Sequence, residues 1–270
     1  MCRWLAYSGP PMVIEDLLFK PQNSLIRQSL AASRSIVPTN GDGFGLGWYG
    51  SGPRPGLFRD TLPAWNDSNL RSLSEQIASD MFFAHVRAST GTSTSRENCH
   101  PFRHGSLLFM HNGAIGGFRQ IRRAIEQLIP AALYGYRLGT TDSEAFFLLA
   151  LGNGLADDIA GALQRTVAQV LSVMAAAGVA EPFHMTAAIS DGRTLWALRY
   201  SDDCCSPTLY YATGAAVGVS GGDLTFVPGS GATLVLSEPL DDREAGWTAI
   251  PEGCLLSARD GAVEIAEFAM

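Results

Sequence analysis

The chain has 270 residues, of which 46% are hydrophobic and 17% charged, a composition typical of one large globular domain or two small ones. Its net charge of -7 argues against nucleic acid or an anionic membrane surface as a partner, because both attract basic proteins. No apolar run approaches the roughly 20 residues that span a bilayer, and acidic residues appear before a secretory leader could form. Five cysteines are an odd number and do not suggest a disulfide framework: Cys2, Cys99, Cys204, Cys205 and Cys254. We therefore expect a cytoplasmic protein in a reducing environment.

Cys2 directly follows the initiator Met1. Bacterial aminopeptidases remove the initiator when the next side chain is small, and this would leave a thiol and a free α-amine on one residue. An α-amine with an unperturbed pKa of about 7.7–8.0 can accept the thiol proton near neutral pH. Taken alone the signal is weak, because a cysteine at this position is usually an ordinary strand residue. Its role as a nucleophile depends on the rest of the chain.

Short strands separated by loops are expected in the first part of the chain. Residues 3–7 predict an apolar strand that the Ser-Gly-Pro-Pro of residues 8–11 closes. Residues 40–49 alternate glycine with bulky apolar residues, which indicates a strand whose bare backbone allows close approach of another element or a ligand. This is not a phosphate-binding loop, since no Gly-Lys-Ser/Thr follows. Residues 50–63 predict a loop rich in glycine and proline, and residues 68–79 a helix.

Residues 81–88 predict a strand buried on both faces, with Arg87 near its end. A charge in that position is either paired structurally or faces a site. The polar loop of residues 89–95 could place hydroxyl and amide groups beside it. A further strand over residues 106–111 ends in Asn112-Gly113, a dipeptide that most often forms a tight hairpin turn.

Helical periodicity is found in the middle of the chain, over residues 118–129 and 157–177. Thr141 and Glu144 have the spacing of a capping box and predict a helix that begins there and runs to about residue 151. Asp142 lies in the first turn of that helix, where its charge could simply complement the helix dipole.

Short β segments dominate from residue 183 onward. Asp191-Gly192 and Asp260-Gly261 predict hairpins within a set of short strands at residues 185–190, 194–200, 209–212, 232–237, 254–258 and 263–268. No linker or repeat separates two halves. Strands, then helices, then strands again predict an α+β fold in which two sheets pack together with helices outside, and we expect one domain over residues 1–270.

A metal site is an alternative use of the cysteine and histidine residues. Cys99, His100, His104 and His111 could bind a metal together with an acidic residue. However, Cys99 and His100 are adjacent, and no second cysteine lies at tight ligand spacing. We therefore expect no bound metal and no cofactor.

Six separated features resemble the class II glutamine amidotransferases, N-terminal-nucleophile amidohydrolases with a cysteine nucleophile. In chain order they are Cys2 after Met1, the glycine-rich strand, His85-Val86-Arg87 with Thr90, Asn98-Cys99-His100-Pro101, His111-Asn112-Gly113, and Asp142. The Met-Cys-Arg-Trp-Leu-Ala-Tyr start, the Asn-Gly-Asp-Gly-Phe-Gly run and the late Ser237-Glu238-Pro239-Leu240 are similar to the stand-alone bacterial branch, which includes the γ-glutamyl hydrolase of ergothioneine synthesis. The resemblance spans nearly the whole chain and implies a four-layer αββα sandwich of two mainly antiparallel sheets.

The resemblance also implies a role for each matching residue. Cys2 would attack the γ-carbonyl of glutamine or a γ-glutamyl compound, with its α-amine as general base, and Asn112 and Gly113 would form the oxyanion hole. For the zwitterionic head group, Arg87 would bind the α-carboxylate, helped by Thr90, and Asp142 would bind the α-ammonium. The supporting residues would be His85, His100 and His111.

Two positions depart from the pattern of family members joined to a synthase, which often carry an aromatic residue after the arginine and a histidine after the threonine. Here these positions are Ala88 and Gly91. These two positions therefore do not indicate a strict preference for free glutamine over other γ-glutamyl compounds. The chain either hydrolyses a γ-glutamyl amide outright, which we favour, or supplies ammonia to a separate acceptor subunit. A non-catalytic γ-glutamyl-binding module is a further alternative, and a homo-oligomer is compatible with each.

Overall fold

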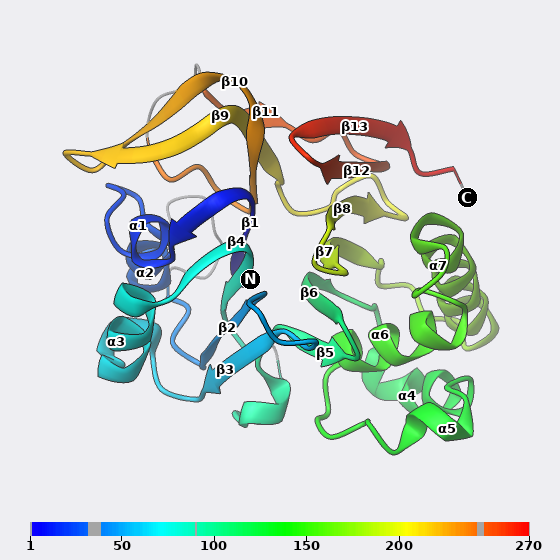
Figure 1. Ribbon diagram of the computed structural model, residues 1–270. Helices are drawn as coiled ribbons and strands as arrows, with labels where there is room; N and C mark the ends of the chain where they lie inside the picture. Colours follow the sequence, from blue (N-terminus) through cyan, green and yellow to red (C-terminus); the bar gives the residue numbers. More distant parts are fainter. Residues whose placement is uncertain (1, 32–38, 90, 242–245, 270) are drawn as a thin grey trace.

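The computed structural model describes residues 2–31, 39–89, 91–241 and 246–269. Two antiparallel sheets pack face to face, and helices cover the outer face of each sheet (Figure 1). Helices α1 to α3 lie on one side of the molecule and α4 to α7 on the other. This four-layer α+β arrangement confirms the fold predicted from the sequence.

The first sheet has seven strands in the order β11-β9-β10-β1-β4-β2-β3. Its strands are β1 (Arg3–Val13), β2 (Phe44–Trp48), β3 (Gly56–Asp60), β4 (Ala78–Val86), β9 (Tyr210–Ser220), β10 (Asp223–Leu236) and β11 (Thr248–Ala249). Strand β1 is central, with Leu5 opposite Leu236 on one side and Ala84 on the other. The residue before β1, Cys2, therefore lies at the end of a strand that is paired along both edges.

The second sheet has six strands in the order β13-β12-β8-β7-β6-β5. They are β5 (Phe102–His104), β6 (Leu107–Ala114), β7 (His184–Ser190), β8 (Thr194–Ser201), β12 (Cys254–Arg259) and β13 (Ala262–Glu267). The predicted hairpins at Asp191-Gly192 and Asp260-Gly261 join β7 to β8 and β12 to β13.

The helices are mostly short. They are α1 (Glu15–Leu18), α2 (Leu25–Leu30), α3 (Ser68–Gln76), α4 (Phe118–Gln127), α5 (Ala131–Tyr134), α6 (Asp142–Gly152) and α7 (Ile159–Ala176), with 3-10 turns η1 (Ala64–Asn66) and η2 (Arg96–Asn98). Helix α7 is long and apolar enough to cross a membrane by length and composition alone. However, Leu163, Val167 and Val170 are buried in the core against β7 and β8, so α7 is the core helix of a folded domain.

Strand alternation divides the apolar residues into three layers. In β4, Phe82 and Ala84 face the helices α1 to α3, whereas Met81 and Phe83 lie between the sheets. In β6, Phe109 faces α6, whereas Met110 lies between the sheets. The same alternation sends His111 to the helix side and Asn112 to the inter-sheet side, so neighbouring residues of one strand serve different parts of the molecule.

The N-terminal strand is fastened by the late Ser237–Leu240 segment. Trp4 and Ser237 exchange hydrogen bonds, because the Trp4 N–H donates to Ser237 Oγ at 3.2 Å and the Ser237 N–H donates to the Trp4 carbonyl at 3.0 Å. Arg3 Nε pairs with Glu238 Oε2 at 3.1 Å, with both side chains buried. Arg3 Nη1 also donates to the Cys2 carbonyl at 3.0 Å. A buried ion pair therefore holds the backbone of Cys2 in place.

Several expected boundaries were wrong. Strand β1 does not close at Ser8 but continues to Val13, with a register shift between Ser8 and Met12 that accommodates two prolines without ladder N–H groups. Strand β3 lies within the expected loop of residues 50–63. Asn112-Gly113 forms no hairpin turn, because both residues pair with β7 inside β6. The expected strands at 209–212 and 232–237 are parts of the longer β9–β10 hairpin.

We expect Glu238→Gln to lower the free energy of unfolding by about 3–5 kcal/mol, because it leaves the buried Arg3 guanidinium without a counter-charge. Urea unfolding followed by circular dichroism measures this. The control is Lys20→Gln, which removes an exposed ion pair with Glu15 and Asp16 and should cost no more than about 1 kcal/mol. Equal losses in the two variants would contradict the anchoring role of Glu238.

Candidate active site

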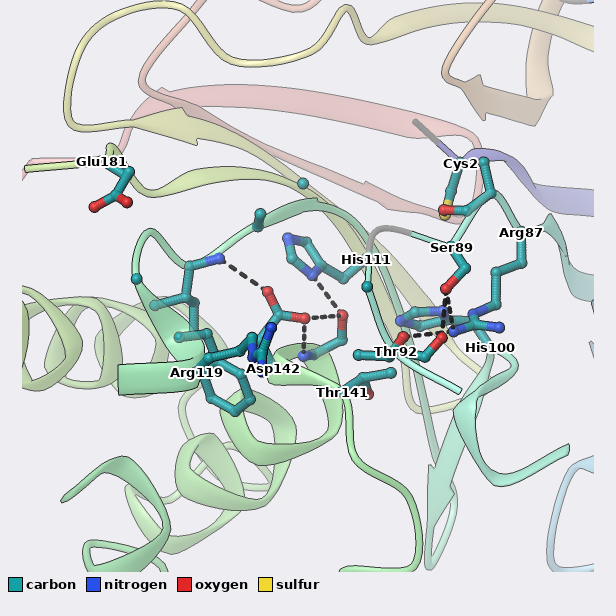
Figure 2. Close-up of a pocket in the computed structure, with 18 of the residues that line it drawn as sticks. Cys2, Arg87, Ser89, Thr92, His100, His111, Arg119, Thr141, Asp142 and Glu181 are labelled. Atoms are coloured by element: carbon teal, nitrogen blue, oxygen red, sulfur yellow. Dashed lines mark hydrogen bonds between the residues drawn. The ribbon is translucent and has the colours of Figure 1, made fainter. Parts of the chain in front are cut away.

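A cavity of about 540 Å³ opens beside the start of β1 and the ends of β4 and β6, near the first turns of α4 and α6 (Figure 2). It contains candidate residues from distant parts of the chain, together with several that the sequence did not single out. Its lining includes Cys2, Arg87, Ala88, Ser89, Gly91, Thr92, His100, His111, Gly113, Arg119, Asp142, Ser143 and Glu181. The expected nucleophile and both expected head-group residues thus share one cavity. Thr90 lies outside the described residues.

Cys2 is partly buried, and its thiol donates to the Ala88 carbonyl with an S···O distance of 3.6 Å. Burial raises the pKa of the Cys2 thiol, while the Ala88 hydrogen bond and the positive charge of Arg87 act in the opposite direction. Because burial is the largest effect, the thiol keeps its proton near neutral pH. A nucleophilic reaction at Cys2 therefore needs a base to take that proton.

Arg87 is buried and lines the cavity, yet its hydrogen-bond partners among the described residues are all neutral oxygens. Nη1 donates to the Asp42 carbonyl at 3.1 Å, and Nη2 donates to Thr92 Oγ1 at 2.6 Å, Ser89 Oγ at 3.2 Å and the Ser93 carbonyl at 3.3 Å. Within the described ranges no carboxylate pairs with it. A buried guanidinium without a counter-ion is costly, so a carboxylate that enters the cavity would complete the site.

Asp142 is the first residue of α6, where the Thr141 side chain caps the helix by accepting from the Glu144 N–H at 3.2 Å. Asp142 Oδ2 accepts from the Ile115 N–H at 2.9 Å, and Oδ1 accepts from the Ser143 N–H at 2.8 Å. Glu144 does not complete the predicted capping box. Its carboxylate instead binds Arg137 and the N–H groups of the 138–139 turn.

Asn112 and Gly113 occupy different positions relative to the cavity. Gly113 lines it, whereas the Asn112 side chain is buried toward the inter-sheet layer and is absent from the lining. Asn112 Nδ2 has no acceptor among the described residues, which makes it a buried donor available to an oxygen. Gly113 has a φ of +150°, and a Cβ there would lie 1.9 Å from the His184 carbonyl oxygen. Only glycine fits this position without displacing β7.

Three histidines surround this region, and all are buried. The rings of His85 and His100 lie 4.4 Å apart, and burial lowers the pKa of His85 to about 3 and that of His100 well below its ordinary value. Both rings are therefore neutral. His100 also lines the cavity, and its two buried ring nitrogens have no partner among the described residues. His111 lies 2.8 Å from Ser143 Oγ.

The residues of the metal hypothesis have separate surroundings. The Cys99 thiol donates to the carbonyls of Asp60 and Ser95, and His104 packs edge-on against Tyr136. No group of three or more histidine, cysteine or acidic residues in the described part of the chain is arranged to bind a metal.

Several functional contacts were not identified from the sequence. Asp42 accepts from the Ser89 N–H at 2.7 Å and so fixes the polar loop beside Arg87. Asn98 joins this loop to the segment before α6, because its amide donates to the Ser93 carbonyl at 2.8 Å and its Oδ1 accepts from the Thr140 N–H at 2.7 Å. The expectation that residues 89–95 supply hydroxyl groups next to Arg87 is confirmed for Ser89 and Thr92, whereas Asp42 was noted only as part of the Asn-Gly-Asp-Gly-Phe-Gly run and was given no role.

Comparison with known proteins identifies the family. The family model described as glutamine amidotransferases class-II matches residues 21–269. The chain belongs to the class II glutamine amidotransferases. It is 34% identical to the probable glutamine amidotransferase DUG3 of Saccharomyces cerevisiae, across 96% of this chain and 82% of the yeast protein. It is 27% identical to the gamma-glutamyl-hercynylcysteine sulfoxide hydrolase of Mycolicibacterium smegmatis, across 98% and 99% of the two chains.

Solved structures of similar fold agree with this assignment. A glutamine aminotransferase class-II domain protein from Silicibacter pomeroyi superposes with a TM-score of 0.75 at 34% identity, covering 100% of both chains. The glutamine phosphoribosylpyrophosphate amidotransferase of Bacillus subtilis superposes with a TM-score of 0.64 at 15% identity, covering 99% of this chain and 49% of the larger enzyme. At that identity the second likeness concerns the fold alone.

We expect Gly113→Ala in this amidotransferase to lower the free energy of unfolding by at least about 2 kcal/mol more than Gly105→Ala does. Both glycines have a positive φ, but a Cβ at Gly105 (φ +58°) meets nothing within 4 Å, whereas one at Gly113 would overlap the His184 carbonyl. Comparing the urea unfolding of the two variants thus separates the cost of backbone strain from the cost of steric overlap. Similar losses for both would show that β6 can move away from β7.

Proposed function

We propose that the chain cleaves the γ-amide bond of glutamine or of a γ-glutamyl compound through a thioester on Cys2. The observation that carries the proposal is the presence in one cavity of a thiol, a carboxylate and a buried guanidinium that has no acidic partner among the described residues: Cys2, Asp142 and Arg87. A γ-glutamyl group offers an electrophilic carbonyl, a carboxylate and an ammonium group to match them.

Charge complementarity supports the binding of the head group. Arg87 has only neutral partners among the residues described, so the substrate α-carboxylate would supply the missing anion in a bidentate geometry. Asp142 keeps acceptor capacity after it has bound two backbone N–H groups, and the α-ammonium would use it. Thr90 would add a hydrogen bond to the carboxylate.

The chemistry requires a free α-amine on Cys2, which removal of Met1 would provide. This amine would take the thiol proton as the sulfur attacks the γ-carbonyl, and would return the proton to the leaving nitrogen as the C–N bond breaks. Water would then attack the thioester carbonyl, with the same amine accepting its proton and the thiol leaving. The Gly113 N–H and Asn112 Nδ2 would stabilise the oxyanion, each donor contributing about 2.7–4 kcal/mol. His85, His100 and His111 would support these groups.

Direct hydrolysis of a γ-glutamyl compound is favoured over ammonia supply by the lining of the cavity. Ala88 and Gly91 are small and both line it, at positions where synthase-linked family members often carry an aromatic residue and a histidine. The cavity volume, about 540 Å³, lies in the range of sites for ligands larger than free glutamine. The name of the mycobacterial relative, a gamma-glutamyl-hercynylcysteine sulfoxide hydrolase, agrees with this choice.

The remaining properties follow from the same proposal. Residues 1–270 would act as a single amidotransferase domain in the cytoplasm, with a small molecule as substrate. A homo-oligomer or a separate acceptor subunit would be compatible with the activity, and an ammonia-supplying glutaminase subunit is the second candidate.

The first test is the intact mass of the protein before and after treatment with a glutamine-mimicking diazoketone. We expect loss of Met1 and one covalent adduct, with Cys2→Ala forming no adduct and showing no turnover while it still binds glutamine. Turnover by Cys2→Ala would overturn the mechanism. Processed protein that binds γ-glutamyl compounds but takes no adduct and cleaves none would instead identify a binding module.

Substitutions at Arg87 and Asn112 should affect different kinetic constants. Arg87→Ala should raise KM about 10- to 100-fold, because the guanidinium would bind the head group equally in ground and transition states. Asn112→Ala should lower kcat about 10²- to 10³-fold with little change in KM, because its donor would act on the oxyanion. The exposed Asn69→Ala on α3 is the control and should change neither. A KM effect alone for Asn112→Ala would contradict its assignment.

A further inference from the structure

Ser143 connects a buried histidine to the carboxylate that would bind the substrate ammonium. It is the second residue of α6, it is buried, and it was not singled out by the sequence. Its Oγ lies 2.8 Å from His111 Nδ1 and 3.3 Å from Asp142 Oδ1. One hydroxyl group therefore touches both a titratable ring and a carboxylate.

The direction of the hydrogen bonds follows from the partner of the other ring nitrogen. His111 Nε2 lies 3.3 Å from the His184 carbonyl oxygen, which can only accept, so in the neutral ring Nε2 carries the hydrogen. Nδ1 is then an acceptor, and the Ser143 hydroxyl donates its single proton to it. The hydroxyl cannot donate to Asp142 at the same time.

The result is a pair of acceptors beside the cavity. When the hydroxyl proton points to His111 Nδ1, the Ser143 N–H is the donor left to Asp142 Oδ1 among the described residues, and the lone pairs of Ser143 Oγ lie 3.3 Å from this oxygen. Two adjacent oxygens that both accept would repel each other unless a donor joined them. An ammonium group has three donors and no acceptor, and both residues line the cavity that it would enter.

We infer that His111 and Ser143 are positioning residues that keep Asp142 open as an acceptor for the substrate ammonium. Protonation of His111 reverses the direction of the hydrogen bonds that join His111, Ser143 and Asp142. A protonated ring donates from Nδ1 to Ser143 Oγ, and the hydroxyl proton then turns to Asp142 Oδ1. This step occupies the acceptor and adds a positive charge nearby, so substrate binding weakens. The inference rests on the proposed function of the cavity.

The groups around His111 determine the sign of the pH effect. Those that face it are Asp142 from α6, His85 from β4 and His100 from the loop before β5. Burial lowers the pKa of His111, and the Asp142 charge opposes this only in part. His85 and His100 stay neutral, because burial lowers the pKa of His85 to about 3 and that of His100 well below its ordinary value. The ring is therefore neutral near pH 7 and becomes protonated only in acid, where affinity is lost.

Calorimetric titration of L-glutamine into Cys2→Ala protein tests this without turnover. Glutamine keeps both head-group charges between about pH 5 and pH 7, so the ligand does not titrate. We expect affinity to hold near pH 7 and to fall on the acid side, because burial lowers the pKa of His111 from its ordinary value. Adding Ser143→Ala should weaken binding about fivefold to tenfold at pH 7, the effect of one lost hydrogen bond, and should flatten the pH dependence. Ser143→Thr should restore both, and the exposed Ser172→Ala on α7 should change neither.

Glutaramate, which is glutamine without its ammonium group, separates positioning from general damage. Ser143→Ala should leave its affinity within about twofold of the parent value, because only the ammonium uses the acceptor pair. His111→Asn offers an independent check, since the amide cannot titrate and the acid loss of glutamine affinity should disappear. Equal weakening of glutamine and glutaramate, or an unchanged pH dependence in both variants, would overturn the inference while the proposed function stands. Failure of the parent protein to bind glutamine or any γ-glutamyl amide would overturn both.

Discussion

The buried pairing of Arg3 with Glu238 is the interaction on which the site depends. The first residues of a chain are ordinarily poorly ordered, so a cavity residue at position 2, such as the proposed nucleophile Cys2, needs contacts that fix it. Here Arg3 binds Glu238 at 3.1 Å and the Cys2 carbonyl at 3.0 Å, while Trp4 and Ser237 pair through backbone and hydroxyl groups. Residues more than 230 positions apart thus hold the Cys2 backbone, and Cys2 lines the cavity.

Two buried polar groups at or near the cavity lack the partners that buried polar groups normally have. Arg87 is a buried cation with neutral partners, and Asn112 Nδ2 is a buried donor without an acceptor in the described structure. Each feature lowers stability, since buried polar groups are normally satisfied. Neighbouring polar groups such as Glu144 are fully paired by contrast, through Arg137 and two backbone N–H groups. Arg87 is thus the group in the cavity lining that a ligand carboxylate would complete.

Much of this could be predicted from the sequence, and the failures have physical causes. Helices α4, α6 and α7 and the β7–β8 hairpin carry strong periodicity and turn chemistry, and they lie within a few residues of their predicted bounds. The predicted strands at the β9–β10 hairpin are too short, because the glycines of this hairpin weaken the strand pattern. The predicted β1 is also too short, because two prolines usually end a strand. Cys2, Arg87 and Asp142 were recognised by residue type and order. Ser143 was not, since only the folded register of β6 against α6 shows that its hydroxyl meets His111.

That register explains why three consecutive residues of β6 act differently. A strand alternates its faces, so His111 meets α6, Asn112 turns to the inter-sheet layer, and Gly113 again lies on the His111 side, beside the cavity. A shift of one residue would exchange these faces and place the Asn112 amide against Ser143. Gly113 resists such a shift, because its positive φ and the close His184 carbonyl admit no side chain. The Asn-Gly pair, which in most sequences marks a turn, here fixes the register that separates a buried donor from a buried histidine.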